Sequence, residues 1–293
     1  MDIVITYVDG LDPLWQADYE KYAGRPVLEK RFRDWGFLRF LFRGIEAHIP
    51  FVRKVFLVVA RESQVPSWVD RSKVNVVLHS DIIPEDFLPV FNSSSIEMFL
   101  HRIPGIDEEI LYLNDDFYPM RDCTHETFFP GGKAVVGMSR QYVVAGNDFR
   151  YLVRNSDRMA RRAAGRFRRL SYLRPQHICY ALLKSRCDAL YESSRDEIFR
   201  SVTRLRERPN FNIYMYLDYM HYLGCTVNSR QSKKHFSLSV AKLEEICGFI
   251  LNPTKDFVCI NDVRMSDEKF RKYQSGILAA FEKAFPEKSA YEL

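Results

Sequence analysis

The sequence feature that most constrains the fold is a short apolar segment that ends abruptly in polar residues. Residues 110–113 read Ile-Leu-Tyr-Leu, and Asn114, Asp115 and Asp116 follow them directly. Such a segment is typical of a buried strand that delivers oxygen atoms to the edge of a sheet. Adjacent carboxylates repel each other and lose solvation when they are buried, and a bound cation offsets that cost. The pattern predicts a magnesium-type site; the alternative is a solvated turn capped by Asn114 and Asp115.

Three further segments are rich in β-branched residues and are predicted as central strands: residues 3–8, 55–59 and 74–78. Helical periodicity predicts helices over residues 31–48 and 94–102. Strands that alternate with helices are typical of an α/β fold with a mostly parallel sheet flanked by helices. Ligands of such sheets bind beyond the carboxyl ends of the strands. That rule places Asp9, which follows the first strand, and residues 114–116 at the same edge.

A second Asn-Asp pair follows another apolar segment near the end of the chain. Residues 257–260 read Phe-Val-Cys-Ile and lead into Asn261 and Asp262. The likeness to residues 111–115 suggests two strand ends that converge on one cation. Chance recurrence of a favourable turn dipeptide is the alternative.

The middle of the chain changes character after residue 146. Nine arginines and one aspartate lie between Arg150 and Arg174, and arginine recurs at every fourth position from 150 to 166. This pattern predicts a basic amphipathic helix, whose charged face is either solvated or docked on anionic lipid or an anionic substrate. Further helices are predicted over residues 177–190, 196–206 and 211–223. We therefore expect a single catalytic domain, in which residues 1–145 and 225–293 form the α/β core and residues 146–224 form a mainly helical subdomain.

Composition excludes several classes of protein. The 293 residues are 46% apolar and 28% charged, which fits a globular chain with a sizeable core and argues against disorder. Six cysteines without C-x-x-C pairs signal neither a zinc site nor a disulfide framework. No apolar run is long enough to cross a bilayer and no signal peptide is recognisable, so we expect a cytoplasmic protein. The net charge of +5 is mild and no nucleic-acid motif occurs, so no nucleic-acid partner is expected.

Taken together, these segments resemble the Stealth family of sugar-phosphate transferases. Four blocks carry the likeness: residues 2–15; residues 31–116, with Val-Pro-Ser-Trp at 65–68 and Leu-His-Arg-Ile-Pro-Gly at 100–105; His177 and Tyr180 with Arg206; and residues 257–262 with the tail 285–292. The resemblance covers nearly the whole chain. The sequence departs from the family pattern where Tyr7 replaces a usual Trp, where Trp35 and Phe37 replace an Asn and a Glu, and where Cys179 replaces a common Pro.

The resemblance implies a Rossmann-like (GT-A-like) fold and a phosphotransferase activity. The expected reaction transfers a hexose 1-phosphate from a UDP-sugar to a hydroxyl of an oligosaccharide, polysaccharide or lipid-linked glycan, and it releases UMP. The product would belong to a capsular or other cell-surface polysaccharide. The implied cofactor is Mg²⁺ or Mn²⁺, held by Asp115, Asp116, Asn261 and Asp262. A metal-dependent glycosyltransferase that releases UDP is the alternative.

The resemblance also implies roles for individual residues. His177 is the expected general base, with Asp115 or Asp116 as its rival, and Arg206 is expected to bind phosphate. The expected substrate-binding residues are Asp9, Gly10, Trp15, Arg39, Asn92, His101, Arg102 and Asn114. Turn formation or packing is the alternative for each of them, and a structural histidine is the alternative for His177. We expect a bacterial cytoplasmic enzyme, held at the inner membrane face by residues 150–174 or by a lipid-linked acceptor.

Overall fold

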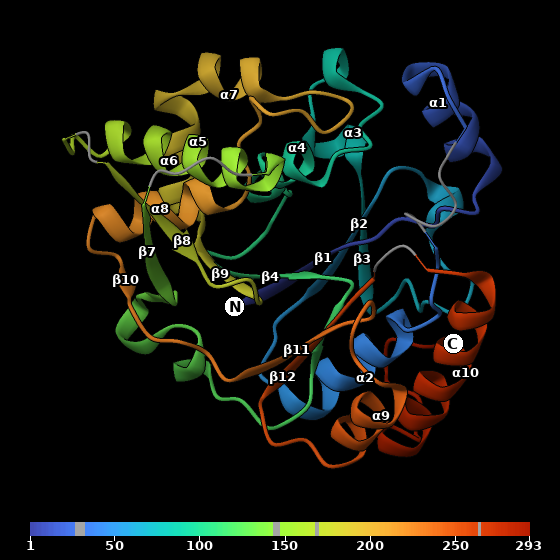
Figure 1. Ribbon diagram of the computed structural model, residues 1–293. Helices are drawn as coiled ribbons and strands as arrows, with labels where there is room; N and C mark the ends of the chain where they lie inside the picture. Colours follow the sequence, from blue (N-terminus) through green and yellow to red (C-terminus); the bar gives the residue numbers. More distant parts are fainter. Residues whose placement is uncertain (27–32, 143–146, 168–169, 263–264) are drawn as a thin grey trace. The chain divides into compact units, whose positions relative to one another are not determined.

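The computed structural model describes residues 1–26, 33–142, 147–167, 170–262 and 265–293 (Figure 1). The chain forms two compact units. The first unit comprises residues 1–4, 77–112 and 125–231, and the second unit comprises residues 5–76, 113–124 and 232–293. None of the described helices is both long enough and apolar enough to span a bilayer.

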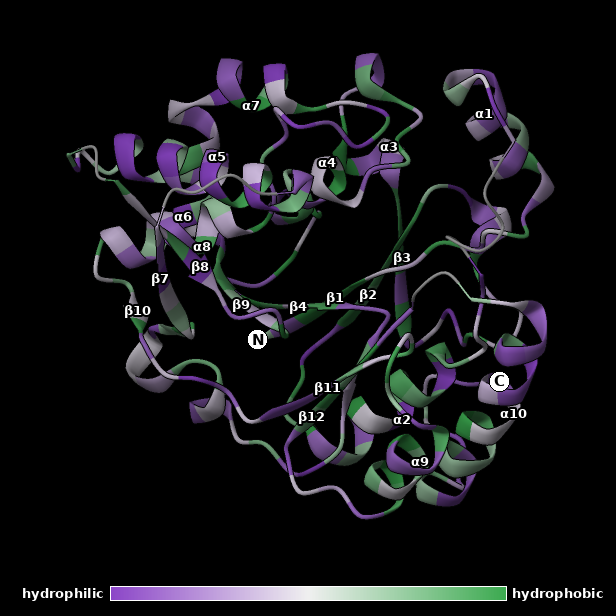
Figure 2. Ribbon diagram, viewed as in Figure 1, coloured by the Kyte–Doolittle hydropathy of each residue, from purple (hydrophilic) through white to green (hydrophobic). Residues whose placement is uncertain are grey.

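A five-stranded sheet has the order β3-β2-β1-β4-β9. Its strands are β1 (Asp2–Thr6), β2 (Val55–Val59), β3 (Val74–Leu78), β4 (Glu109–Asn114) and β9 (Tyr180–Leu183). The order 3-2-1-4 is that of doubly wound, Rossmann-like sheets. All residues of β2 are buried, and Figure 2 shows β1, β2 and β4 mainly in hydrophobic colours. The prediction of an α/β fold with a mostly parallel, helix-flanked sheet is confirmed.

The first unit contains the helices from the middle of the sequence, α3 to α8. Its helices are α3 (His79–Ile82), α4 (Ser93–Glu97), α5 (Asp148–Ala163), α6 (Lys184–Ser193), α7 (Arg195–Ser201) and α8 (Tyr214–Tyr222). Its smaller strands are β6 (Ala134–Val135), β7 (Met138–Tyr142), β8 (Ser171–Pro175) and β10 (Thr226–Val227). Helix α5 packs on α8 and buries Leu152, Val153 and Met159, while hydrophilic residues make up much of its length (Figure 2). The basic amphipathic helix is therefore present.

The second unit contains a three-stranded sheet with the order β11-β12-β5. Its strands are β5 (Phe117–Pro119), β11 (Lys233–Ser237) and β12 (Phe257–Asn261), and its helices are α1 (Pro13–Ala23), α2 (Leu38–His48), α9 (Leu243–Leu251) and α10 (Asp267–Ala284). Strand β12 runs parallel to β11 and antiparallel to β5. Helix α9 packs on α10, where Gly276 faces the side chain of Leu243.

Single turns of 3₁₀ helix connect several of these elements. They are Glu62–Gln64, Glu85–Phe87, Leu100–Arg102, His125–Thr127 and Pro130–Gly132. The predicted helix over residues 94–102 is wrong in its second half, because α4 ends at Glu97. Met98 and Phe99 donate their backbone N–H groups to the carbonyls three residues before them, at 3.3 and 3.0 Å, which breaks the α-helical pattern.

Two other predicted helices begin later than their sequence patterns suggest. The predicted helix over residues 177–190 is wrong at its start, because residues 180–183 pair antiparallel with residues 109–112 of β4 and only α6 is helical. The helix predicted over residues 31–48 begins at Leu38, after Gly36 adopts a left-handed φ of 74°. Its first two predicted positions, Arg31 and Phe32, lie outside the described residues.

Candidate active site

The polar ends of two apolar segments lie together in the second unit. Strand β12 pairs with β5 so that Cys259 lies opposite Phe117. The backbone N–H of Ile260 donates to the carbonyl of Asp116 at 3.0 Å. This pairing brings Asn261, which ends β12, and Asp262, which follows it, to the turn that contains Asp115 and Asp116. The two Asn-Asp pairs therefore converge, as their similarity in the sequence suggests.

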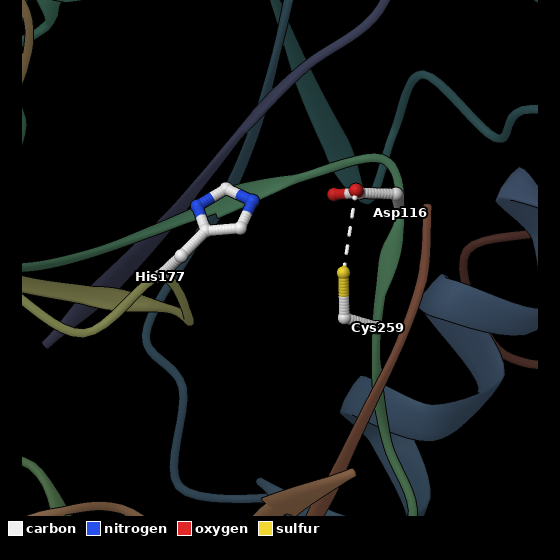
Figure 3. Close-up of side chains that lie close together, drawn as sticks. All are labelled: Asp116, His177 and Cys259. Atoms are coloured by element: carbon white, nitrogen blue, oxygen red, sulfur yellow. Dashed lines mark hydrogen bonds between the residues drawn. The ribbon is translucent and has the colours of Figure 1, made fainter. Parts of the chain in front are cut away.

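Asp116 has one satisfied and one unsatisfied carboxylate oxygen. The buried thiol of Cys259 donates to Oδ2 at 3.4 Å, as Figure 3 shows. The other oxygen, Oδ1, is buried and has no hydrogen-bond partner within the described parts of the chain. Desolvation raises the pKa of this carboxyl to about 6, although the Cys259 hydrogen bond and the charge of Lys233 act in the opposite direction. A buried, unsatisfied carboxylate oxygen is the donor that a hard cation would satisfy.

Asp115 lies among other carboxylates. The residue as a whole is exposed, yet desolvation of its carboxyl and the charge of Asp116 raise its pKa to about 7. The charges of Asp34 and Asp262 act in the same direction. A cation bound among these groups would remove the repulsion between them. The oxygen donors at Asp115, Asp116, Asn261 and Asp262 therefore suit Mg²⁺ or Mn²⁺.

Tyr7, in the loop after β1, lies near this group of carboxylates. Desolvation raises the pKa of Tyr7 strongly, and the nearby charges of Asp34, Asp9 and Asp115 raise it further. Tyr7 also has a side-chain hydrogen bond with Asp34. We call Asp9, Asp34, Asp115, Asp116 and Asp262 the acidic cluster. Asp34 belongs to the second sequence block, and only the fold shows which carboxylates lie near it.

The other predicted residues of the second unit make local contacts. The Gly10 carbonyl accepts from the side chain of Gln16 at 2.7 Å. Trp15 is 2% exposed and stacks on Tyr19 with ring centroids 5.5 Å apart. The guanidinium of Arg39 lies 5.3 Å from the centre of the Trp68 ring. Asn114 is the last residue of β4. Substrate binding by these residues stays a prediction.

The first unit holds a histidine and two tyrosines in one hydrogen-bonded chain. Nδ1 of His177, which lies just before β9, is 2.6 Å from the hydroxyl of Tyr180. Tyr180 is also hydrogen-bonded to Tyr214, which begins α8. Desolvation is the main cause that raises the pKa of both phenols, so both stay neutral at neutral pH.

Glu97 and Arg206 complete this network. Glu97 is buried, and its Oε2 accepts from the backbone N–H of Ile213 at 2.8 Å. Desolvation raises its pKa to about 7, and the charge of Arg206 opposes that rise. The guanidinium of Arg206 donates to the hydroxyl of Ser93 at 2.7 Å.

The charge of Glu97 also acts on both Tyr180 and Tyr214. We call His177, Tyr180, Tyr214, Glu97 and Arg206 the tyrosine–histidine network. The two predicted catalytic residues of the third block are linked only through other residues: His177 is hydrogen-bonded to Tyr180, and Arg206 lies near Glu97, whose charge acts on both tyrosines. Glu97 lies within the second block, residues 31–116, and its burial on a short helix of the first unit is what singles it out.

The remaining predicted residues of the first unit contact the protein itself. The Asn92 side chain donates to Oδ1 of Asn210 and to Ser95, both at 3.0 Å. His101 packs between the rings of Tyr191 and Tyr216, and burial lowers its pKa to about 3. Arg102 donates to the carbonyl of Ile82 at 3.0 Å. These contacts account for the residues structurally, and their roles in substrate binding stay predictions.

Comparisons with known proteins agree with the sequence blocks. The family model described as Stealth protein CR2, conserved region 2, matches residues 31–136. The capsular polysaccharide phosphotransferase WcwK of Streptococcus pneumoniae is 30% identical, and the match covers 100% of this chain and 99% of WcwK. The receptor polysaccharide phosphotransferase WefC of Streptococcus oralis is also 30% identical, with the same coverage of 100% and 99%.

Among solved structures, the galactosyltransferase LgtC in complex with donor and acceptor sugar analogs is similar at a TM-score of 0.36. It is 12% identical, and the match covers 94% of this chain and 95% of LgtC.

Proposed function

This chain belongs to the Stealth family of bacterial polysaccharide phosphotransferases, and on that premise we propose that it transfers a hexose 1-phosphate from a UDP-sugar to a glycan hydroxyl. The acceptor would be an oligosaccharide, polysaccharide or lipid-linked glycan of a capsular or other cell-surface polysaccharide. The observation that carries the proposal is the acidic cluster, whose buried and unsatisfied oxygen suits a cation that binds a diphosphate. The full-length relatives that are named phosphotransferases support this choice of reaction.

The proposed reaction needs charge neutralisation at the diphosphate. Mg²⁺ or Mn²⁺ would be held by Asp115, Asp116, Asn261 and Asp262, and it would supply a Lewis acid that neutralises the phosphoryl oxygens. Arg206 presents a planar fork to a phosphate, and its contact with Ser93 limits the positions that the guanidinium can take.

The acceptor hydroxyl must lose a proton as it attacks. Its oxygen would form a bond to the β-phosphorus of the donor, and the bond from that phosphorus to the bridging oxygen would break, so that UMP leaves. We assign the proton to His177, with Asp115 or Asp116 as the rival base. The acidic cluster belongs to the second unit and the tyrosine–histidine network to the first unit.

The loop after β1 is proposed to meet the nucleotide. Ligands of doubly wound sheets bind near that loop, which contains Asp9 and Gly10 and leads into α1 with Trp15. Arg39, Asn92, His101, Arg102 and Asn114 are proposed to bind the substrates or to support the residues that do.

We also propose that the protein works in the cytoplasm at the inner membrane face. Several α5 arginines are engaged with protein, since Arg161 pairs with buried Asp157 at 2.7 Å and Arg162 pairs with Glu197. Arg158 is exposed, and Phe167 and Leu170, which follow the helix, are 92% and 86% exposed. Exposed basic and apolar side chains together suit an anionic membrane, at about 1 kcal/mol for each basic residue near the surface. Vesicles with anionic lipid should float the protein in low salt and release it in high salt, and flotation that is equal with neutral vesicles would contradict this placement.

The nucleotide product tests the proposed reaction. The protein would be incubated with a panel of UDP-sugars, Mg²⁺ and candidate glycans, and the released nucleotide would be separated by chromatography. Release of UMP with formation of a sugar phosphodiester is the expected result. Release of UDP would show that the anomeric bond breaks instead, which is glycosyl transfer. The Asp116→Asn variant is the matched control for activity that does not depend on the acidic cluster.

A further inference from the structure

Two buried asparagine side chains join distant segments of the first unit. Asn92 is 1% exposed and Asn210 is fully buried. The amide nitrogen of Asn92 donates to Oδ1 of Asn210 and to the hydroxyl of Ser95. Its oxygen accepts from the backbone N–H of Ser94 at 3.2 Å, as the cap of α4. Protein atoms therefore occupy both ends of the Asn92 amide, which leaves the side chain little capacity to bind a substrate.

Asn210 closes the loop that contains Arg206. Its Oδ1, which accepts from Asn92, also accepts from the backbone N–H of Glu207 at 2.6 Å. Its amide nitrogen donates to the hydroxyl of Thr203 at 2.8 Å. A flipped amide would turn its own N–H groups toward the Glu207 N–H, so these contacts fix which end of the amide faces Asn92. We call residues 203–210, which lie between α7 and α8, the arginine loop.

The segment around α4 holds the arginine loop at two further points. The hydroxyl of Ser95 donates to the carbonyl of Thr203 at 2.8 Å and accepts from its backbone N–H at 3.0 Å. Arg206 is exposed, and its guanidinium donates to the hydroxyl of Ser93. The backbone of the loop and the guanidinium that it presents are thus both attached to residues 92–95.

From these contacts we propose that Asn92 is a positioning residue: through Asn210 it holds the arginine loop so that Arg206 presents its guanidinium to a phosphate. A guanidinium held in place loses less conformational freedom when it binds an anion, and that gain raises affinity. The inference deepens the proposed function, because the phosphate that Arg206 would bind is that of the UDP-sugar in the proposed reaction. The attachment of the loop itself does not depend on which reaction the protein catalyses.

Three variants separate this role from general packing. Asn92→Asp keeps the size of the side chain and the oxygen that caps α4, but it replaces both N–H donors by an oxygen that repels Oδ1 of Asn210. Asn212→Asp is the matched control, because Asn212 is a buried asparagine of the same unit and its oxygen, which accepts from Ser156 at 2.9 Å, is retained. Ser93→Ala removes only the hydroxyl that Arg206 contacts.

Hydrogen exchange of the nucleotide-free protein, followed by mass spectrometry, measures the attachment of the loop. The backbone N–H groups of Thr203 and Glu207 are hydrogen-bonded, so they should exchange slowly in the wild type and in Asn212→Asp. Asn92→Asp should speed exchange in the arginine loop by about 10-fold or more, while β2 stays protected. Unchanged exchange in the loop would overturn the inference, and an equal rise in β2 would attribute the change to general unfolding and overturn it as well.

Affinity for UDP in the presence of Mg²⁺, measured by calorimetry, tests the positioning of Arg206. Loss of a group that orients a binding residue costs about 10- to 100-fold in other sites. We expect Asn92→Asp to weaken UDP binding by about 10-fold, Ser93→Ala to weaken it less, and Asn212→Asp to bind like the wild type.

The decisive comparison combines Asn92→Asp with Arg206→Ala. A positioning residue acts only through the residue that it positions, so Asn92→Asp should cause no further loss of UDP affinity once Arg206 is replaced. An equal loss with and without Arg206 would overturn the positioning role, even if exchange in the arginine loop changes. A wild type that does not bind UDP would count against the proposed function, whereas hydrogen exchange alone decides whether Asn92 holds the loop.

Discussion

The buried carboxylates of the acidic cluster and of the tyrosine–histidine network differ in how they are stabilised. In the network, Glu97 accepts a backbone hydrogen bond and lies near the Arg206 charge. In the acidic cluster, Asp115 and Asp116 raise each other's energy, and one Asp116 oxygen has no hydrogen-bond partner in the described chain. In the network the charge of Glu97 is met by groups of the protein, whereas the cluster keeps an unsatisfied oxygen that the proposed cation would bind.

The largest expected effect is a loss of turnover in a variant of the tyrosine–histidine network. His177→Ala should lower turnover by about 10²- to 10⁴-fold, because a positioned base contributes that much to proton transfer. UDP-sugar affinity, measured by calorimetry, should stay close to that of the wild type, since the histidine is not assigned to donor binding. His221→Ala, which removes another histidine of the first unit, is the control. Near-normal turnover of His177→Ala would remove His177 from the chemistry.

The next largest effect is expected for variants of the acidic cluster, and it is a change in the Mg²⁺ requirement. Asp115→Asn and Asp262→Asn each remove a charged oxygen donor from the proposed cation site. Each should raise the Mg²⁺ concentration needed for half-maximal turnover by about 10-fold or more, while Asp122→Asn, whose side chain is 91% exposed, should not. Identical Mg²⁺ titrations in wild type and both variants would defeat the proposed cation site.

The raised pKa values of the cluster predict how stability depends on pH without metal. The pKa of Asp115 is about 7 and that of Asp116 about 6 in the folded chain, above the ordinary value of 3.8. The folded state therefore binds more protons than the unfolded state between about pH 4 and pH 7, and stability falls as pH rises through that range. Thermal unfolding in a chelator should show this fall, and Asp115→Asn should reduce it. Added Mg²⁺ should restore stability above pH 7 in the wild type.

The smallest expected effect tests how the cluster is held in place. Cys259 donates to one oxygen of Asp116, so it orients the other oxygen toward a cation. Cys259→Ala should weaken Mg²⁺ binding several-fold, and Cys259→Ser, which keeps a donor, should weaken it less. Equal loss in both variants would attribute the effect to packing in β12 and not to the hydrogen bond.

Local sequence patterns predicted the strands and the acidic ends well. Residues 55–59 and 74–78 became β2 and β3 with the expected bounds, because short, β-branched apolar runs leave few other structures. The repeated strand-end pattern suggested that the two Asn-Asp pairs converge, and the pairing of β12 with β5 is what brings them together.

Features that depend on long-range pairing were not predictable in the same way. Residues 180–183 have a helical pattern but form β9, because β4 supplies hydrogen bonds that the local pattern does not reveal. The positions of Asp34 and Glu97 near other charges, and of Tyr214 beside Tyr180, likewise depend on contacts between segments far apart in the chain. The residue types indicated which chemistry is available, while the fold determined which of these residues lie close to one another.

Calorimetric titration of the metal-free protein with Mn²⁺ measures directly whether the converging strand ends bind a cation. Binding should be saturable in the wild type at pH 8 and should be lost in Asp116→Asn, whose buried amide cannot replace the charged oxygen. His177→Ala should bind Mn²⁺ like the wild type. Equal Mn²⁺ binding by wild type and Asp116→Asn would contradict the claim that the two converging strand ends form a cation site.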